Sequence, residues 1–273
     1  MALNPSLKII APWKDPNFTL TSREAAVDYA KKHKIPIEQS KKKIYSRDRN
    51  LWHISHEGAD LEDPANEPKD NLFVISRPVS KTPNKPDYVK IGFNKGVPTK
   101  LNGKNTNGVK LIEQLNRLGG KHGIGQLDLV ENRLVGIKSR GIYETPGGTI
   151  LVTAHKTLEG LTLDRETMHY KQQLALKYAE LVYYGQWFSQ LRQALDAFVD
   201  ITQQNVTGEV KMKLFKGHCT PAGVKSPNSL YSTDLASFKM GAEFNPTDAI
   251  GFIRLFGLPM KVSAAVNKTK KNK

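Results

Sequence analysis

Two segments of the chain alternate apolar and polar residues, which is the period of a strand with one buried face. They are DYVKIGFNKG at 87–96 and GEVKMKLFKG at 208–217. Their apolar positions are Val89, Ile91 and Phe93 in the first segment and Val210, Met212 and Leu214 in the second. A shorter β-branched run, KIIAP at 8–12, ends at a proline as a strand end does. We predict strands at all three segments, with 87–96 in an antiparallel sheet.

The segment TSRE at 21–24 has the spacing of a capping box. In such a box the Thr21 hydroxyl and the Glu24 carboxylate each satisfy a free backbone N–H group at the start of a helix. We therefore predict a helix that runs through Lys32 and is ended by the residues around Pro36.

Two later segments have helical periodicity. Residues 109–118, VKLIEQLNRL, place four apolar side chains on one face, and the glycines 119 and 120 that follow predict the end of that helix. A longer helical pattern runs over residues 162–204, and Gly185 predicts a break in it. Its second half carries a narrow apolar stripe, typical of helix packing. The stripe consists of Phe188, Leu191, Leu195 and Phe198.

The order of these elements favours an α+β fold. Helical and strand patterns are mixed without the regular alternation of a doubly wound parallel sheet. We expect a domain of mixed sheet and long helices, since 273 residues with 38% apolar residues suffice for a sizeable core. From residue 244 an apolar segment precedes a lysine-rich tail. We expect a frayed end and an apolar segment suited to packing against identical subunits.

The chain is basic, with 41 Lys and Arg against 26 Asp and Glu and a formal net charge of +15. Such a charge favours anionic partners. The basic residues are spread along the whole sequence, and no RNP, KH or zinc-finger pattern accompanies them. Nucleic-acid binding is therefore an alternative only, because a basic surface that attracts small anionic substrates explains the charge equally well.

Neither a membrane nor a secreted location is indicated. No run approaches the ~18 apolar residues that span a bilayer, and the first residues lack the layout of a secretion signal. The single Cys219 has no partner for an internal disulfide, and with His218 it lacks the further ligands of a zinc site. We expect a cytoplasmic protein with no membrane partner and with both residues in structural roles.

Common cofactor motifs are not found. The sequence has no GxxxxGK[ST] phosphate loop, and the pair Gly147 and Gly148 is better explained as a turn. His53, His56 and Glu57 in WHISHEG match no established zinc spacing, so we expect no metal there. The stretch 45–58 also lacks the GxSxG elbow of hydrolases, which makes its serines hydrogen-bonding groups rather than nucleophiles.

The stretch VENRLVGIKSRGIYETPGG, residues 130–148, combines charges and glycines with apolar residues that should be buried. The apolar residues are Val130, Leu134, Val135, Ile137 and Ile142. Taken alone, the residues favour an ion pair of Glu131 with Arg133 or Lys138, and a core position for the Tyr143 ring with its hydroxyl in water.

Long ordered blocks of the chain resemble the argininosuccinate synthase family. These blocks are SRDRNLWHISHEG, GKHGIGQLDLVENRLVGIKSRGIYETPGGT, SPNSLYSTDL and FNPTDAIGFI, and the resemblance extends from Ala2 to about Ile253. It implies an AMP-forming ligase of arginine biosynthesis and a homotetramer. In this family the ureido oxygen of citrulline attacks the α-phosphorus of ATP and releases pyrophosphate. The amine of aspartate then displaces AMP from the citrullyl adenylate. Such chemistry depends on positioning and charge stabilisation more than on a protein nucleophile.

The resemblance also implies that Ser46, Ser55, Glu131 and Tyr143 bind citrulline. Citrulline carries an ammonium and a carboxylate beside a neutral ureido arm, so one carboxylate, two hydroxyls and an aromatic ring form a suitable site. We expect Glu131 to hold the ammonium and the serines to orient the amino-acid end or the ureido group. Tyr143 would cover the arm and offer its hydroxyl. No catalytic residue is assigned.

The sequence departs from the family at its start. The family begins with a nucleotide-binding domain whose SGGLDTS loop holds ATP, and the resemblance begins where that domain is nearly finished. We therefore expect residues 1–20 to be the end of the nucleotide-binding domain, 21–243 the synthetase domain and 244–273 an oligomerisation segment with a basic tail. ATP with magnesium is expected for the complete enzyme, with its site largely absent from this chain. The alternative is a non-catalytic assembly or binding fragment.

Overall fold

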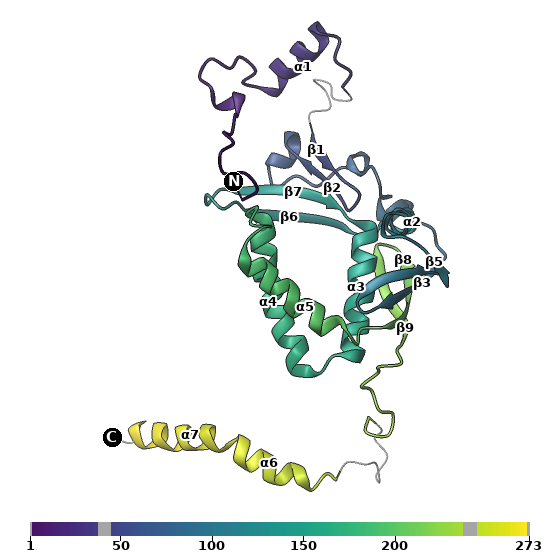
Figure 1. Cartoon of the computed structure of the whole chain (residues 1–273), viewed down its shortest axis with the longest axis vertical. Helices are drawn as coiled ribbons and strands as arrows, with labels where there is room; N and C mark the ends of the chain where they lie inside the picture. Colours follow the sequence, from purple (N-terminus) through teal and green to yellow (C-terminus); the bar gives the residue numbers. More distant parts are fainter. Residues whose placement is uncertain (1, 38–44, 237–244, 272–273) are drawn as a thin grey trace. The chain divides into compact units, whose positions relative to one another are not determined.

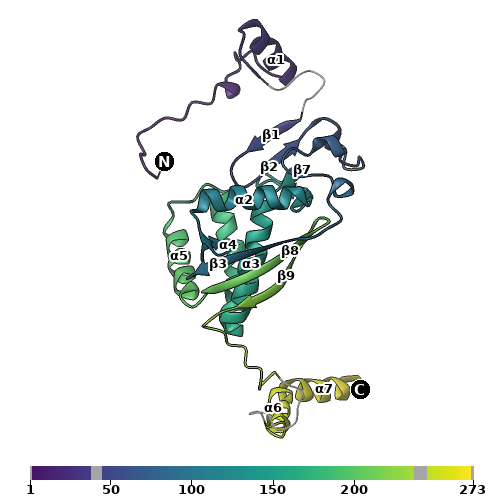
Figure 2. The same cartoon turned by 90° about the vertical axis from the view of Figure 1, so that its right-hand side faces the viewer.

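The computed structural model describes residues 2–37, 45–236 and 245–271 and combines helices with two antiparallel sheets (Figures 1 and 2). The α+β prediction is confirmed. Contacts within the chain divide it into two units, Met1–Asn228 and Ser229–Lys273.

The larger sheet contains five strands in the order β5-β4-β3-β8-β9. Its strands are β3 (Asp87–Asn94), β4 (Val97–Leu101), β5 (Lys104–Asn105), β8 (Gly208–Phe215) and β9 (His218–Lys225). β3 and β8 are antiparallel, with Val89 opposite Met212 and Ile91 opposite Val210. All four of these side chains are buried, so both alternating segments form strands as predicted, within an antiparallel sheet.

Two helices build the main core on this sheet. Helix α3 (Pro146–Thr162) contacts β3, β8 and β9, and helix α2 (Gly108–Lys121) packs against α3. The apolar face predicted for α2 is confirmed, because Leu111, Ile112 and Leu115 are buried in the same core cluster as the strand residues.

The smaller sheet has the strand order β1-β2-β7-β6, and every neighbouring pair is antiparallel. The strands are β1 (Ser46–Arg49), β2 (Ile54–Glu57), β6 (Gln126–Asn132) and β7 (Lys138–Glu144). Between β2 and β3 the chain forms three short 3-10 helices, η2 (Ala59–Glu62), η3 (Asp70–Leu72) and η4 (Val79–Lys81). Leu61, Leu72 and Ile142 form a small separate core here.

The long helical pattern corresponds to two helices, α4 (Arg165–Tyr183) and α5 (Gln190–Gln203). The predicted break is confirmed, because Gly185 has a positive φ of 70° just after α4. Within the predicted stripe, Leu195 is buried, whereas Phe188 and Leu191 are exposed.

Both glycine pairs were interpreted wrongly. Gly119 and Gly120 lie inside α2, and a Cβ on Gly120 would lie 2.1 Å from the carbonyl oxygen of Ile75. Gly147 and Gly148 lie in the first turn of α3 rather than in a free turn. The glycines are needed for close packing of a helix against neighbouring chain, a role that has no local sequence signal.

The amino-terminal segments differ from expectation in two places. The strand prediction at 8–12 is wrong, because a 3-10 helix, η1 (Pro12–Lys14), begins at its last residue and the segment pairs with no strand in the described residues. Helix α1 (Arg23–Lys32) ends as predicted, but its cap is Ser22, whose Oγ accepts the N–H of Ala25 at 3.1 Å. The cap thus lies one residue after Thr21.

Four of the five apolar residues expected to be buried in 130–148 are exposed. They are Val130, Leu134, Val135 and Ile137, whereas Ile142 is buried. The exposed residues lie on β6 and in the β6–β7 turn, where the described residues of the chain do not cover them.

The second unit contains α6 (Asp248–Phe256) and α7 (Leu258–Lys271). The expectation of a frayed end is wrong as far as Lys271, since α7 remains helical to that residue. No single described helix is long and apolar enough to cross a membrane, and α6 and α7 meet that test only as a pair bent by 45°.

Candidate ligand-binding site

The four-stranded sheet brings the four candidate residues to one face. Ser55 lies opposite Tyr143, and Ser46 lies opposite Glu57, which is two residues from Ser55 on the same strand. On β6, Glu131 is four residues from Leu127, the partner of Tyr143. Successive strand residues point to opposite faces, so all these side chains share one side. We call it the front face. Its polar residues are Ser46, Asp48, Ser55, Glu57, Glu131, Ser139 and Tyr143.

Two front-face candidates are in direct contact. The Tyr143 hydroxyl donates a hydrogen bond to Oε1 of Glu131 at 2.7 Å, and both side chains are half-buried. Burial raises the pKa of the Tyr143 phenol above its usual value of 10, and the hydrogen bond to Glu131 raises it further. The phenol therefore keeps its proton across the physiological pH range.

This hydrogen bond determines what the pair can offer to a ligand. Because the Tyr143 proton is directed to Glu131, the phenol oxygen retains only lone pairs for a second partner. A carboxylate accepts several hydrogen bonds, so Glu131 also keeps acceptor capacity. The pair suits a group rich in N–H donors, such as an ammonium, and Tyr143 is better placed to accept than to donate.

The ion pairs considered for Glu131 are not formed. Nε of Arg133 donates to Oγ of Ser139 at 3.3 Å, and Nζ of Lys138 donates to Oδ1 of Asn132 at 2.7 Å. Neither cation bridges to Glu131 in the described chain. Among the described residues, only Tyr143 donates a hydrogen bond to the Glu131 carboxylate, which can accept further hydrogen bonds from a ligand at the front face.

The turn between β1 and β2 is held by three hydrogen bonds. Oδ1 of Asn50 accepts the backbone N–H groups of Trp52 and His53 at 2.8 and 2.9 Å. Nδ2 of Asn116 on α2 donates to the carbonyl of Leu51 at 2.9 Å. These contacts fix the start of β2 and with it the buried side chain of Ser55.

Three further residues belong to this face or its border and were not assigned from the sequence. The His53 ring lies 6.0 Å from the Tyr143 ring, and Asp48 and Glu57 alternate with the back-face residues of β1 and β2. The charge of Glu57 contributes to the raised pKa of Tyr143. Pairing β1 with β2 around the turn would have identified the two acids, since both strands then present alternate residues to one side.

The opposite face, which we call the back face, is organised around Glu144. Its Oε1 accepts from Nε2 of His56 at 2.8 Å and from the Val74 N–H at 2.7 Å. Its Oε2 accepts from the N–H groups of Ile75 and Ser76 and from Oγ of Ser76, at 2.9, 2.7 and 2.7 Å. Burial alone would raise the pKa of Glu144, but these hydrogen bonds outweigh it and lower the pKa. Glu144 therefore anchors the 74–76 segment to the sheet.

Further polar groups of the back face are also paired. Nε of Arg47 donates to Nδ1 of His56 at 3.0 Å, which leaves the ring proton on Nε2 for Glu144. Arg140 binds both carboxylate oxygens of Asp128, at 2.9 and 2.7 Å. Both ring nitrogens of His56, which was considered above as a metal ligand, are thus hydrogen-bonded within the sheet.

Comparison with known proteins assigns the family. Residues 45–263 match the family described as arginosuccinate synthase C-terminal domain. The chain belongs to the argininosuccinate synthase family. It is 59% identical over 267 residues to the argininosuccinate synthase of Desulfitobacterium hafniense (strain DSM 10664 / DCB-2) and 60% identical over 267 residues to that of Carboxydothermus hydrogenoformans. Each alignment covers 98% of this chain and 66% of the relative, so the chain spans about two thirds of their length.

The argininosuccinate synthase family uses ATP, and the described residues provide no evident place for ATP with a metal. In residues 2–37, 45–236 and 245–271 no group of three or more His, Cys, Asp or Glu side chains could hold a metal ion. Cys219 lies half-buried on β9, where burial raises the pKa of its thiol. The sequence also has no phosphate loop, so no residue of the described chain is assigned to a magnesium–nucleotide site.

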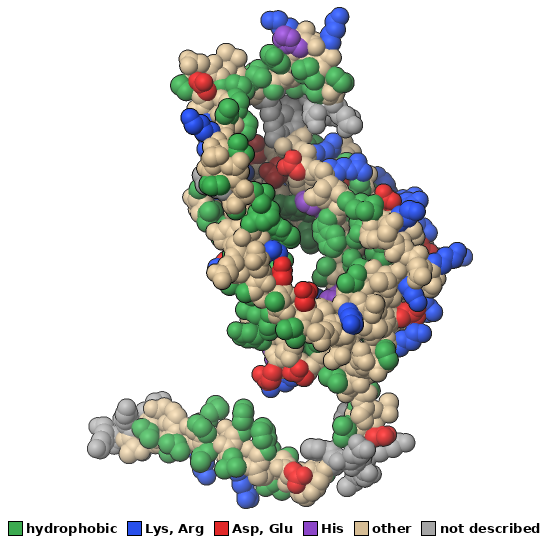
Figure 3. Space-filling view, viewed as in Figure 1, with side chains coloured by type: hydrophobic (Ala, Val, Ile, Leu, Met, Phe, Trp, Pro, Cys, Tyr) green, Lys and Arg blue, Asp and Glu red, His purple; other side chains and the backbone are tan. Residues whose placement is uncertain are grey.

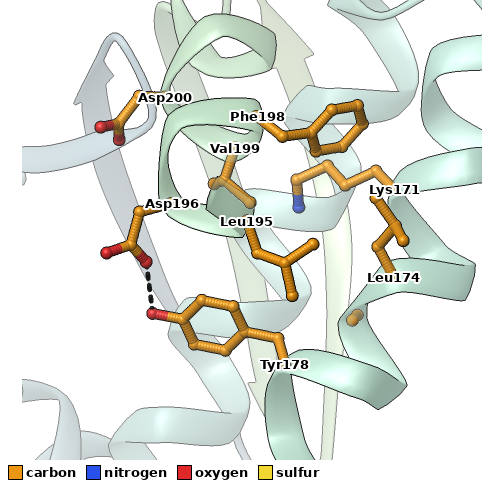
Figure 4. Close-up of a pocket in the computed structure, with 9 residues that line it drawn as sticks. Lys171, Leu174, Tyr178, Leu195, Asp196, Phe198, Val199 and Asp200 are labelled. Carbon is orange, nitrogen blue, oxygen red and sulfur yellow. Dashed lines mark hydrogen bonds between the residues drawn. The ribbon is translucent and has the colours of Figure 1, made fainter. Parts of the chain in front are cut away.

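A separate pocket of about 450 Å³ lies between α4 and α5 (Figure 4). The Tyr178 hydroxyl donates to Oδ1 of Asp196 at 2.7 Å, and Nζ of Lys171 pairs with Oε1 of Glu159 at 2.9 Å. None of the four candidate residues lines it.

Figure 3 shows acidic side chains and a histidine around the hollowed area beside β6 and β7, whereas Lys and Arg gather over the five-stranded sheet.

Proposed function

We propose that this chain is the citrulline-binding part of an argininosuccinate synthase. The observation that carries the proposal is the hydrogen-bonded pair of Tyr143 and Glu131 on the same face as Ser46 and Ser55. Family membership supplies the reaction class, and the front face supplies groups that suit this substrate. In the complete enzyme, citrulline and aspartate are joined at the expense of ATP within arginine biosynthesis.

The charge of the front face orients the substrate. Asp48, Glu57 and Glu131 are all acidic, so their combined field attracts the ammonium of citrulline and repels its carboxylate. Glu131 holds the ammonium, because its second oxygen and the phenol oxygen of Tyr143 both accept hydrogen bonds. The carboxylate then points away from this face.

The two serines and the tyrosine ring bind the rest of the molecule. A hydroxyl both donates and accepts, so Ser46 and Ser55 suit either end of the ureido group or the amino-acid end. The half-buried Tyr143 ring supports the apolar methylene arm. These residues position citrulline for attack and need not transfer a proton, which agrees with chemistry dominated by orientation.

ATP with magnesium and aspartate are substrates of the complete enzyme in this proposal. We assign no contact with them to this chain, because its sequence has no phosphate loop and its described residues hold no group of three metal-ligating side chains. The resemblance further supports a homotetramer.

Reconstitution tests the enzyme proposal. The chain is mixed with a separately expressed nucleotide-binding domain of a relative, ATP, magnesium, citrulline and aspartate, and AMP and argininosuccinate are measured. We expect both products, and fewer of them when Glu131→Gln replaces the wild-type chain. Product formation that is equally fast with the wild-type chain and with variants of its proposed citrulline-binding residues would refute the proposal. Titration of the chain alone with citrulline in a calorimeter gives a direct second measurement.

A non-catalytic assembly module is the second candidate. It is favoured by the large apolar residues that α6 leaves exposed within its own unit. They are Ile250, Phe252, Ile253, Leu255 and Phe256. Sedimentation distinguishes the candidates: a tetramer that binds no citrulline supports the module alone, and a well-folded monomer excludes it.

A further inference from the structure

Gly141 lies in β7, and the space above it is filled by the ring of Tyr143. A Cβ placed on Gly141 would lie 2.8 Å from Cε2, 3.0 Å from the hydroxyl oxygen and 3.1 Å from Cζ of Tyr143. All three nearest atoms therefore belong to one side chain. The ring must lie back along β7, over Gly141, and this direction brings its hydroxyl to Glu131.

We propose that Gly141 is a positioning residue that keeps the space in which Tyr143 reaches Glu131, and so sets the hydrogen-bond acceptors that a ligand meets. The ligand part of this inference rests on the proposed citrulline site. The arrangement of the two side chains does not.

The surroundings distinguish Gly141 from the packing glycines of the chain. At Gly120 an added Cβ would meet the backbone oxygen of Ile75 at 2.1 Å, which the fold cannot easily move. At Gly141 it would meet the far end of a flexible side chain, and the backbone has no positive φ to strain an alanine. The fold should therefore tolerate an alanine at 141, but the Tyr143 side chain would have to move. Glycine weakens the interior of a strand. A glycine at such a position therefore often marks a place where another group approaches the backbone closely.

Displacing the ring would change the site in a specific way. The Tyr143 hydroxyl would lose its bond to Glu131 and gain contact with water. Its proton would then be lost more easily, and the ligand would meet a freely rotating phenol instead of a fixed acceptor. The carboxylate of Glu131 would remain in place on β6.

The first experiment follows tyrosine ionisation in the full 273-residue chain labelled with 13C-tyrosine, by NMR across alkaline pH. We expect two late-titrating phenols, Tyr143 and Tyr45, since the latter donates to Asp60 at 2.6 Å. The Tyr143→Phe variant lacks the Tyr143 signal and so identifies it in the spectrum. In Gly141→Ala that signal should titrate at a lower pH than in the wild type, whereas Tyr45 should not change.

Gly160→Ala is the matched control, because a Cβ there meets nothing within 4 Å. It should leave both signals unchanged. Tyr143 titrating in Gly141→Ala as it does in the wild type would overturn the inference. If Gly141→Ala does not fold, Gly141→Ala with Tyr143→Ala should restore folding, because the ring that causes the clash is gone. Failure of this double variant to fold would show that Gly141 acts on the backbone, and would also overturn it.

The second experiment measures citrulline affinity by calorimetry in a double-mutant cycle. We expect Gly141→Ala to weaken binding about tenfold in the wild-type background and less than twofold in the Tyr143→Ala background. Equal losses in both backgrounds would contradict action through Tyr143. If the wild-type chain binds no citrulline, the proposed function fails, and the tyrosine titration still decides the role of Gly141.

Discussion

Glu131 and Glu144 are glutamates on adjacent strands of one small sheet, and their surroundings differ sharply. Glu144 lies on the back face with no exposed surface and accepts hydrogen bonds from five donors. Glu131 lies half-buried on the front face and accepts one hydrogen bond from the described residues, that of Tyr143. The first carboxylate is fully used by the protein, whereas the second retains capacity for a ligand.

The difference shows how a structural acid can be told from a binding acid. A buried carboxylate is tolerated only when hydrogen bonds replace the water that it loses. Glu144 meets this requirement entirely from within the chain, so it needs no ligand. Glu131 meets it partly from Tyr143 and partly from solvent, and a ligand N–H group can replace that solvent. The following predictions test whether this difference is functional.

The largest effect is expected for Glu144→Gln. The amide NH₂ group would face donors that now point at a carboxylate oxygen, and the charge that stabilises five hydrogen bonds would be lost. We expect the free energy of unfolding to fall by about 3–5 kcal/mol, measured by urea denaturation. The matched control is Glu131→Gln, for which the unfolding free energy should change little. Equal losses for the two variants would remove the distinction between the faces.

Glu131→Gln should instead act on binding. The substitution keeps the shape but removes a charge-assisted hydrogen bond to the ligand ammonium. Citrulline affinity should fall by about 1.5–3 kcal/mol, roughly ten- to a hundredfold, as measured by calorimetry. Unchanged affinity together with a lowered melting temperature would mean that Glu131 is structural and that the site assignment is wrong.

Acid denaturation tests the stabilising role of Glu144. The pKa of Glu144 is lowered by its hydrogen bonds, so its stabilising contribution is present above the unfolded value near 4.5 and is lost as pH falls through the lower folded pKa. Below pH 4.5 the wild-type chain should lose stability with a slope of up to ~1.4 kcal/mol per pH unit from this group. Unfolding curves of Glu144→Gln should lack this component, and those of Glu131→Gln should retain it.

The same comparison explains how much the sequence could predict. β3 and β8 were predicted because their buried positions are apolar and alternate with polar ones. The small sheet was not, because its back face buries His56, Arg140 and Glu144 where a strand pattern expects hydrophobic residues. Its polar core is held by hydrogen bonds between distant segments, and no local period encodes these bonds.

The candidate site was proposed through family resemblance and not through periodicity. The residues around Glu131 favoured a local ion pair, since Arg133 is close in sequence. The bond to Tyr143 depends instead on the register of β6 with β7 and on the missing side chain at Gly141. Neither condition could be evaluated before the strand pairing was known.

Tyr143→Phe gives the smallest effect and the finest test of the comparison. The variant keeps the ring over Gly141 and removes only a neutral hydroxyl, so the wall of the site is preserved. Citrulline affinity should fall by about 0.5–1.5 kcal/mol, or roughly two- to tenfold, because one acceptor is lost while Glu131 remains. Tyr45→Phe is the control, since its hydroxyl donates to Asp60 and not to the front face, and its citrulline affinity should match the wild type. Calorimetry on both variants measures the difference. A loss for Tyr143→Phe as large as that for Glu131→Gln would show that the phenol, and not the carboxylate, is the principal acceptor of the ligand ammonium.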